Sequence, residues 1–206
     1  MRVTLKLATS LDGRIATASG ESQWITGEAA RLEGHRLRAA HDAILVGVET
    51  VLHDDPELTA RLPGRSVDQP LRVVLDSRLR TPQAAKVAGE NTLILTAAEP
   101  RAIGAAKVVQ VAAEQGRPTI PAVLKALEAA GATSLLIEGG GQVAAAFLRA
   151  NAVDALEWFR APILLGGEGR PCVAALALAK LADAPKFRRL GVAPVGDDLW
   201  ERYARL

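Results

Sequence analysis

The sequence predicts an α/β protein in which a mostly parallel central sheet is flanked by helices and closed by a C-terminal antiparallel hairpin. Short apolar, β-branched runs alternate with helical stretches along most of the chain, which is typical of parallel βαβ units. Apolar residues make up 49% of the chain but aromatic residues only 3%, which favours a sheet covered by helices rich in small residues. A chain of 206 residues has room for one large or two small domains, and we expect one domain over residues 1–206.

The first strand shows the pattern on which the strand predictions rest. Val3, Leu5 and Leu7 alternate with Thr4 and Lys6, which is the period of a strand with two different faces. The strands expected before the C-terminal third are Val3–Ala8, Ala43–Val48, Leu71–Leu75, Thr92–Thr96, Lys107–Val111 and Ser134–Ile137.

Four helices are expected between these strands. Thr26 is the predicted N-cap of the first helix, Thr119 that of the third, and Gly131 is predicted to end the third. The expected helices are Gly27–Ala40, Pro100–Ala105, Ile120–Ala130 and Gln142–Ala150.

The C-terminal third predicts strands rather than helices. Asp154–Arg160, Lys186–Ala193 and Asp198–Arg205 are the expected strands, and Pro194–Asp197 is a turn between the last two. Residues Leu62–Gln69, which include Pro63-Gly64, indicate a surface loop rather than a linker between domains.

Composition excludes several classes of function. A formal net charge of +2 predicts no nucleic-acid-binding face. The single cysteine, Cys172, allows no internal disulfide and no cysteine-based zinc site, and the three histidines lack metal-ligand spacing. No signal sequence opens the chain and no apolar run approaches a membrane span. We therefore expect a cytoplasmic protein without a metal, a membrane or a nucleic acid as partner.

Two N-terminal motifs carry candidate ligand contacts. Lys6 lies on the first strand, small Ala8 leaves room beside the backbone, and an Asp12-Gly13 turn follows. Alternatively, Lys6 is a surface lysine and the turn an ordinary hairpin. Downstream, Ser22 and Trp24 precede a helix, and Trp24 offers a broad face to a ligand or packs as a lid over the helix start.

Candidate phosphate contacts follow the strand that ends at Gly47. Arg38 and Arg61 are candidates because guanidinium binds phosphate bidentately. Thr50 and Asp54 lie in the polar segment between them. For any single arginine, a solvated ion pair is the competing interpretation.

Two later strands also end in candidate site residues. Ser77 follows one strand, where a serine suits an adenosine 2′-phosphate, although a plain turn capped by Asp76 is the alternative. Glu138 follows another and precedes Gly139-Gly140-Gly141, where the backbone can approach a pyrophosphate. The second glycine-rich loop, Pro162–Gly169, is interpreted as structural or dimer-forming.

Six segments in this order resemble the reductase domain of the bacterial riboflavin biosynthesis protein RibD, a family of the dihydrofolate-reductase-like superfamily. They are KLATSLDGRIA, ESQWIT, LRAAHDAILVGVETVLHDDPELTAR, PLRVVLDSRLRTP, LLIEGGGQVAAAFL and APILLGG. The resemblance implies an NADPH-dependent oxidoreductase that reduces 5-amino-6-(5-phosphoribosylamino)uracil to its ribitylamino product in riboflavin biosynthesis. It also implies a homodimer.

The resemblance assigns roles at the matching positions. Lys6 and Glu138 are expected to polarise or protonate the substrate, and Arg38 and Arg61 to point towards its phosphate. The expected substrate contacts are Ser22, Arg38, Leu58, Arg61 and Glu138. The expected NADPH contacts are Ala8, Trp24, Thr50, Asp54, Ser77, Gly139, Gly140, Gly141, Gln142 and Val143.

The sequence leaves several alternative functions open. Bifunctional members of the family carry a zinc deaminase with H-x-E and P-C-x-x-C motifs, which this chain lacks. We therefore expect a free-standing reductase or an excised domain without deaminase activity, with a separate deaminase as a possible pathway partner. Alternative functions are reduction of dihydrofolate or of a 2,5-diamino-6-ribosylamino-pyrimidinone, which Arg38 and Arg61 distinguish, and non-catalytic nucleotide binding, against which Lys6 and Glu138 argue.

Overall fold

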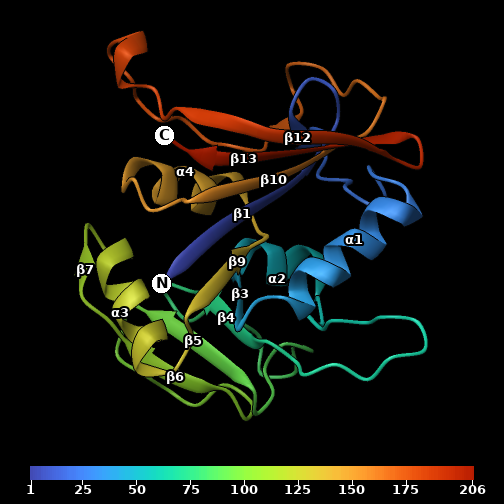
Figure 1. Ribbon diagram of the computed structural model, residues 1–206. Helices are drawn as coiled ribbons and strands as arrows, with labels where there is room; N and C mark the ends of the chain where they lie inside the picture. The colour runs from blue at the N-terminus through green and yellow to red at the C-terminus, as the bar shows by residue number, and fades with distance from the viewer. The chain divides into compact units, whose positions relative to one another are not determined.

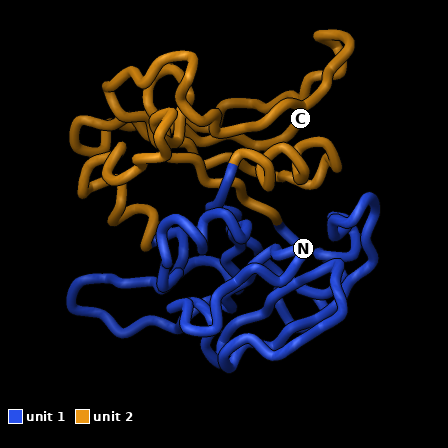
Figure 2. Tube along the Cα trace, turned by 180° about the vertical axis from the view of Figure 1, so that it is seen from behind, with its two compact units in different colours: residues 1–2, 36–140 blue, residues 3–35, 141–206 orange.

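The structure, a computed structural model, describes residues 1–206 and divides the chain into two compact units (Figures 1 and 2). Unit 1 consists of Met1–Arg2 and Arg36–Gly140. Unit 2 consists of Val3–His35 and Gly141–Leu206. Unit 2 is therefore assembled from both ends of the chain, and unit 1 mainly from its middle.

Unit 1 is built on five parallel strands in the order β9-β3-β4-β5-β6. In the central strand β3, Leu45 lies opposite Val73 of β4 and Ile137 of β9, and all three are fully buried. Near-continuous apolar runs of this kind are typical of parallel strands covered on both faces. The strands are β3 (Ala43–Gly47), β4 (Leu71–Leu75), β5 (Thr92–Thr96), β6 (Lys107–Gln110) and β9 (Ser134–Ile137), which confirms the predicted set.

Two helices accompany this sheet. Helix α2 (Val48–Asp54) follows β3 directly and packs Val48 and Val51 against a hydrophobic cluster with Ile44 and Val46. Helix α3 (Ile120–Ala129) begins after Thr119, as predicted, although the Thr119 hydroxyl bonds the Ala112 carbonyl at 3.3 Å instead of capping the helix. A small hairpin of β7 (Ala113–Glu114) and β8 (Arg117–Pro118) precedes α3.

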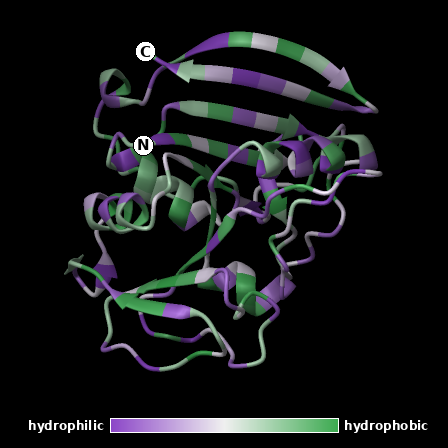
Figure 3. Cartoon of the chain, turned by 60° about the horizontal axis from the view of Figure 1, so that its bottom comes forward, coloured by the Kyte–Doolittle hydropathy of each residue, from purple (hydrophilic) through white to green (hydrophobic).

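The sheet of unit 2 has the order β12-β13-β10-β1. Strand β1 is parallel to β10, whereas β10, β13 and β12 are antiparallel, which confirms the predicted closing hairpin. In Figure 3 the antiparallel strands beside the C-terminus carry both hydrophilic and hydrophobic residues. The strands are β1 (Arg2–Thr9), β10 (Ala155–Arg160), β12 (Phe187–Val195) and β13 (Asp198–Arg205).

Short elements and two helices complete unit 2. Helix α4 (Gly141–Arg149) buries Ala144, Ala145 and Phe147. The remaining elements are α1 (Glu28–Ala39), whose last residues belong to unit 1, β2 (Arg14–Ala16) paired with β11 (Arg170–Pro171), and the 3-10 turn η1 (Leu181–Asp183). The longest helix, α1, has 12 residues, and no helix combines the length and the apolar character that a membrane span requires.

Two sequence predictions are wrong. Pro100–Ala105 forms no helix but a turn closed by a bridge between Ile103 and Ala106, because Gly104 takes a left-handed φ of 53° and its neighbour Ala105 bonds the Ala88 carbonyl. Helix α1 begins at Glu28, so that Gly27 rather than Thr26 precedes it. The Gly27 N–H is held by the Asp198 carboxylate at 2.7 Å instead of by a capping side chain.

Candidate functional site

An arginine–glutamate pair forms the most strongly bonded part of the candidate site in unit 1. Arg38 stands in the last turn of α1, and Glu138 follows β9, where its N–H donates to the Leu45 carbonyl at 3.0 Å. Arg38 Nε donates to Glu138 Oε1 at 2.9 Å, and Nη2 donates to Oε2 at 2.7 Å. The side chains are only 18% and 7% exposed. The pair is therefore bidentate and largely shielded from water.

Glu138 affects the pKa of Arg38. Burial alone lowers the pKa of Arg38, but the charge and hydrogen bonds of Glu138 outweigh this, and the pKa is raised above its usual value. A carboxylate that accepts two bonds from a guanidinium is an acceptor for further N–H groups rather than a source of protons. In this structure the Glu138 carboxylate is oriented by its two bonds from Arg38.

Thr59 links this pair to Arg61. Arg38 Nη1 donates to the Thr59 carbonyl at 3.0 Å, while Arg61 Nη1 donates to the Thr59 hydroxyl and to Glu57 Oε2, both at 2.8 Å. Leu58 is 3% exposed within the α2 hydrophobic cluster and has a φ of 53°, so only its backbone is available to a ligand. Arg38, which is paired with Glu138, and Arg61 therefore both bond Thr59. The sequence analysis missed Thr59, whose position between the two arginines was its only signal.

The glycines after Glu138 are required by close packing and by a left-handed turn. A Cβ on Gly139 would lie 2.7 Å from Val46 Cβ and 2.9 Å from the Thr50 hydroxyl. Gly140 has a φ of 80°, and a Cβ built on it would meet nothing within 4 Å. The turn therefore packs against β3 and α2 at Gly139 and presents open backbone at Gly140.

The remaining predicted residues of unit 1 lie on α2 and on the turn after β4. Asp54 is the exposed last residue of α2. Ser77 is half-buried in a turn organised by fully buried Asp76, which accepts the Thr81 N–H and hydroxyl, both at 2.7 Å. The structure thus contains the turn capped by Asp76, and Ser77 lies within this turn.

In unit 2, Lys6 and Ala8 stand on β1. Lys6 Nζ lies 5.9 Å from the Phe159 ring centroid and 3.8 Å from the position of a Cβ on Gly34 of α1. Ala8 is half-buried and lies opposite Phe159 in the parallel pair. A Cβ at Gly34 would make only ordinary van der Waals contact with the Lys6 side chain.

The loop before α1 holds Ser22 and Trp24. Ser22 is half-buried, whereas Trp24 is 68% exposed, and the Arg31 guanidinium lies 4.6 Å from its ring centroid. The ring is therefore largely open to solvent apart from its contact with Arg31.

Helix α4 begins with the other predicted residues of unit 2. A Cβ on Gly141 would lie 2.5 Å from the Pro171 carbonyl, so glycine is required there for packing. Gln142 is exposed and Val143 is half-buried in the first turn of the helix.

The Asp12 turn binds the second glycine-rich loop. Ser10 Oγ donates to Asp12 at 2.5 Å, and the Leu165 and Gly166 N–H groups donate at 3.2 and 2.8 Å. The Ser10 bond, with the backbone bonds, lowers the pKa of Asp12 to about 2. The two loops were separate motifs in the sequence, and the structure joins them.

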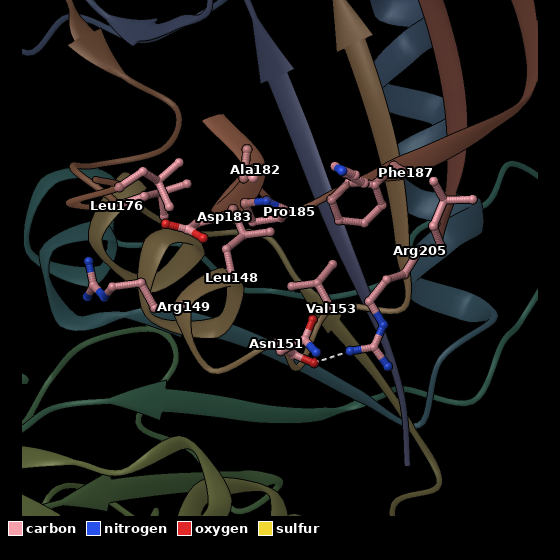
Figure 4. Close-up of a pocket in the computed structure, with 14 residues that line it drawn as sticks. Leu148, Arg149, Asn151, Val153, Leu176, Ala182, Asp183, Pro185, Phe187 and Arg205 are labelled. Atoms are coloured by element: carbon pink, nitrogen blue, oxygen red, sulfur yellow. Dashed lines mark hydrogen bonds between the residues drawn. The ribbon is translucent and has the colours of Figure 1, made fainter. Parts of the chain in front are cut away.

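Each unit has a surface hollow. A hollow of about 640 Å³ in unit 2 lies between the end of α4, η1 and the C-terminus, and no predicted site residue lines it (Figure 4). A hollow of about 500 Å³ in unit 1 is lined by Arg61 and the loop after it. No group of three or more His, Cys, Asp or Glu side chains is arranged to hold a metal ion.

Comparison with known proteins places this arrangement in a family. The RibD C-terminal domain model matches residues 1–200. The riboflavin biosynthesis protein RibD of Bacillus amyloliquefaciens is 39% identical over 206 residues, which cover 96% of this chain and 55% of that protein. The RibD structure from Acinetobacter baumannii superposes with a TM-score of 0.89 at 32% identity, over the whole chain and 58% of its own.

A third match carries a more detailed description. A deaminase and 5-amino-6-(5-phosphoribosylamino)uracil reductase from Thermotoga maritima gives a TM-score of 0.85 at 27% identity, over the whole chain and 56% of its own. The chain thus spans about half the length of the relatives it matches. By sequence and by structure, the chain belongs to the RibD C-terminal domain family.

Proposed function

We propose that this chain is an NADPH-dependent reductase that converts 5-amino-6-(5-phosphoribosylamino)uracil to its ribitylamino product in riboflavin biosynthesis. The observation that carries the proposal is the bonding of Arg38 and Arg61 to the same residue, Thr59, beside Glu138. A ligand with a hydrogen-bonding ring at one end and a phosphate at the other suits this spacing of groups. The reaction named for the Thermotoga relative has such a substrate.

Glu138 and Arg38 are assigned to the pyrimidine. The Glu138 carboxylate can accept N–H groups of the ring, and the two bonds from Arg38 hold it in orientation. Arg61 is assigned to the phosphate because its guanidinium is 59% exposed. Leu58 contributes backbone only, and Ser22 is a further assigned substrate contact.

The glycine turn fits a nicotinamide dinucleotide. Gly140 presents open backbone that a pyrophosphate can approach, and Thr50 lies against Gly139 beside it. Thr50, Asp54, Ser77, Gly139 and Gly140 are assigned to the cofactor in unit 1. Those in unit 2 are Ala8, Trp24, Gly141, Gln142 and Val143. NADPH, when bound, would supply the hydride.

Lys6 is assigned to polarise the substrate. Its ammonium group donates hydrogen bonds and carries no acceptor, so it can protonate or orient an electron-rich atom of the substrate. Its ammonium group lies 5.9 Å from the centroid of the Phe159 ring.

The test is a spectrophotometric assay with the purified chain. NADPH absorbance should fall only when 5-amino-6-(5-phosphoribosylamino)uracil is present. Dihydrofolate is the control substrate, because it has no phosphate for Arg61. Turnover of dihydrofolate without turnover of the phosphoribosyl compound would contradict the proposal.

A further inference from the structure

A short segment of unit 2, residues 169–174, is bonded to the loop that follows β1. Within this segment β11 pairs with β2, so that Pro171 lies opposite Arg14. The next residue, Cys172, donates its N–H to the Gly13 carbonyl at 3.0 Å. The segment and the loop after β1 are therefore joined by a pair of short strands and by a further backbone hydrogen bond.

The same segment packs against the first residue of α4, which also belongs to unit 2. The Ala174 N–H donates to the Gly141 carbonyl at 2.9 Å. A Cβ on Gly141 would lie only 2.5 Å from the Pro171 carbonyl oxygen, so the two backbones are in close contact. The following residue, Gln142, is exposed. The segment thus holds the start of α4 on one side and leaves the next residue of the helix open to solvent.

The start of α4 carries three of the residues assigned to NADPH, which are Gly141, Gln142 and Val143. The N–H groups of a first helical turn have no partner within the helix and can bind an anion. Groups that are already held in place lose less entropy when the ligand binds. A segment that fixes the start of this helix therefore affects the affinity for the cofactor without contacting it.

The pairing of β11 with β2 depends on the glycine that precedes β11. Gly169 is buried, and a Cβ on it would lie 3.0 Å from Arg14 Cγ and 3.1 Å from the Ala16 carbonyl oxygen. Both distances are shorter than an ordinary van der Waals contact, so a side chain here must push β2 and β11 apart. Gly167, in contrast, is exposed, and a Cβ on it would meet nothing within 4 Å. Neither glycine has a positive φ, so the two positions differ in packing and not in backbone strain.

We propose that Gly169 is a positioning residue for the cofactor, because it lets β11 lie against β2 and so hold the start of α4 in place for the dinucleotide. This inference rests on the proposed function for the identity of the dinucleotide, NADPH. The contacts that carry it run from Arg14 through Pro171 to Gly141. The loop after β1 thereby acts on the cofactor through β11.

The test compares Gly169→Ala with Gly167→Ala, a matched control two residues away. NADPH affinity is measured by fluorescence titration, and KM for the uracil compound and kcat are measured at saturating NADPH. Gly169→Ala should weaken NADPH binding roughly fivefold and leave the other two values close to those of the wild type. Gly167→Ala should change none of them. A purely structural glycine would lower the free energy of unfolding without this selective change, so an unchanged NADPH affinity in Gly169→Ala overturns the proposal.

Amide hydrogen exchange without NADPH keeps this result separate from the reductase assignment. In Gly169→Ala, the amides of Cys172 and Ala174 should exchange roughly tenfold faster than in the wild type, because their bonds to Gly13 and Gly141 open more often. In Gly167→Ala they should keep the wild-type rate. If exchange changes as expected but the wild type does not bind NADPH, the proposed function fails while the packing of β11 on α4 stands. Equal exchange in the wild type and Gly169→Ala overturns the positioning role itself.

Discussion

The end of β9 and the loop after α2 each present an arginine–glutamate pair, and the two pairs differ in almost every physical respect. At the end of β9, Arg38 and Glu138 are 18% and 7% exposed and share two hydrogen bonds. In the loop, Arg61 and Glu57 are more than half exposed, and Arg61 Nη1 donates to Glu57 Oε2 at 2.8 Å. The first pair is suited to hold a carboxylate in place, and the second to release its arginine to a ligand.

The difference shows why residue type alone misjudges a candidate site. In the sequence, Arg38 and Arg61 are equivalent candidates for a phosphate. Burial separates them, because a shielded guanidinium must be paired whereas an exposed one exchanges partners at little cost.

The largest expected effect is on stability. Arg38→Ala should lower the free energy of unfolding by about 3 kcal/mol, because it leaves the Glu138 carboxylate buried without its partner. Arg61→Ala, the control, should lower it by less than about 1 kcal/mol. Urea denaturation monitored by circular dichroism measures both. Equal losses would mean that burial does not distinguish the two pairs.

The glycines beside Glu138 give a second, smaller contrast. Gly139→Ala should lower the free energy of unfolding by about 1–3 kcal/mol, because the new Cβ would overlap Val46 and Thr50. Gly140→Ala meets no atom within 4 Å, so its effect should be limited to about 1 kcal/mol from its left-handed φ. Thermal unfolding of the two variants ranks them, and a larger loss at Gly140 would contradict the packing of this turn.

The exposed Asp12 carboxylate should show the smallest effect, confined to its own loop. Its pKa is lowered from 3.8 to about 2, so its contribution is present above about pH 4 and is lost as the pH falls through about 2. The amide proton shifts of Leu165 and Gly166 should therefore titrate together with a midpoint near 2. Asp12→Asn should abolish this transition, and a midpoint near 4 would show that the bonds to Asp12 do not form in solution.

The strands were predictable because they depend on local patterns. Buried runs such as Ala43–Gly47 are apolar throughout. The helix predicted over Pro100–Ala105 was wrong for a local reason as well, because Gly104 takes a left-handed φ of 53°. The candidate residues Arg38, Arg61 and Glu138 were found from their chemistry and from the family resemblance.

What sequence reasoning missed depends on partners far apart in the chain. Arg38 meets Glu138 across 100 residues, and Asp12 meets Gly166 across 154. Thr59 carries no distinctive motif, and only the structure shows that both arginines bond it. The pairing state of an arginine is likewise a property of burial, which a single sequence does not specify.

The most direct test of this account is the KM of Arg61→Ala for its two ligands. In Arg61→Ala, KM for 5-amino-6-(5-phosphoribosylamino)uracil should rise roughly tenfold or more. KM for NADPH and the free energy of unfolding should stay close to the wild-type values. An equal rise in both KM values, or a KM for the substrate that does not change, would contradict the assignment of the exposed arginine to the substrate phosphate.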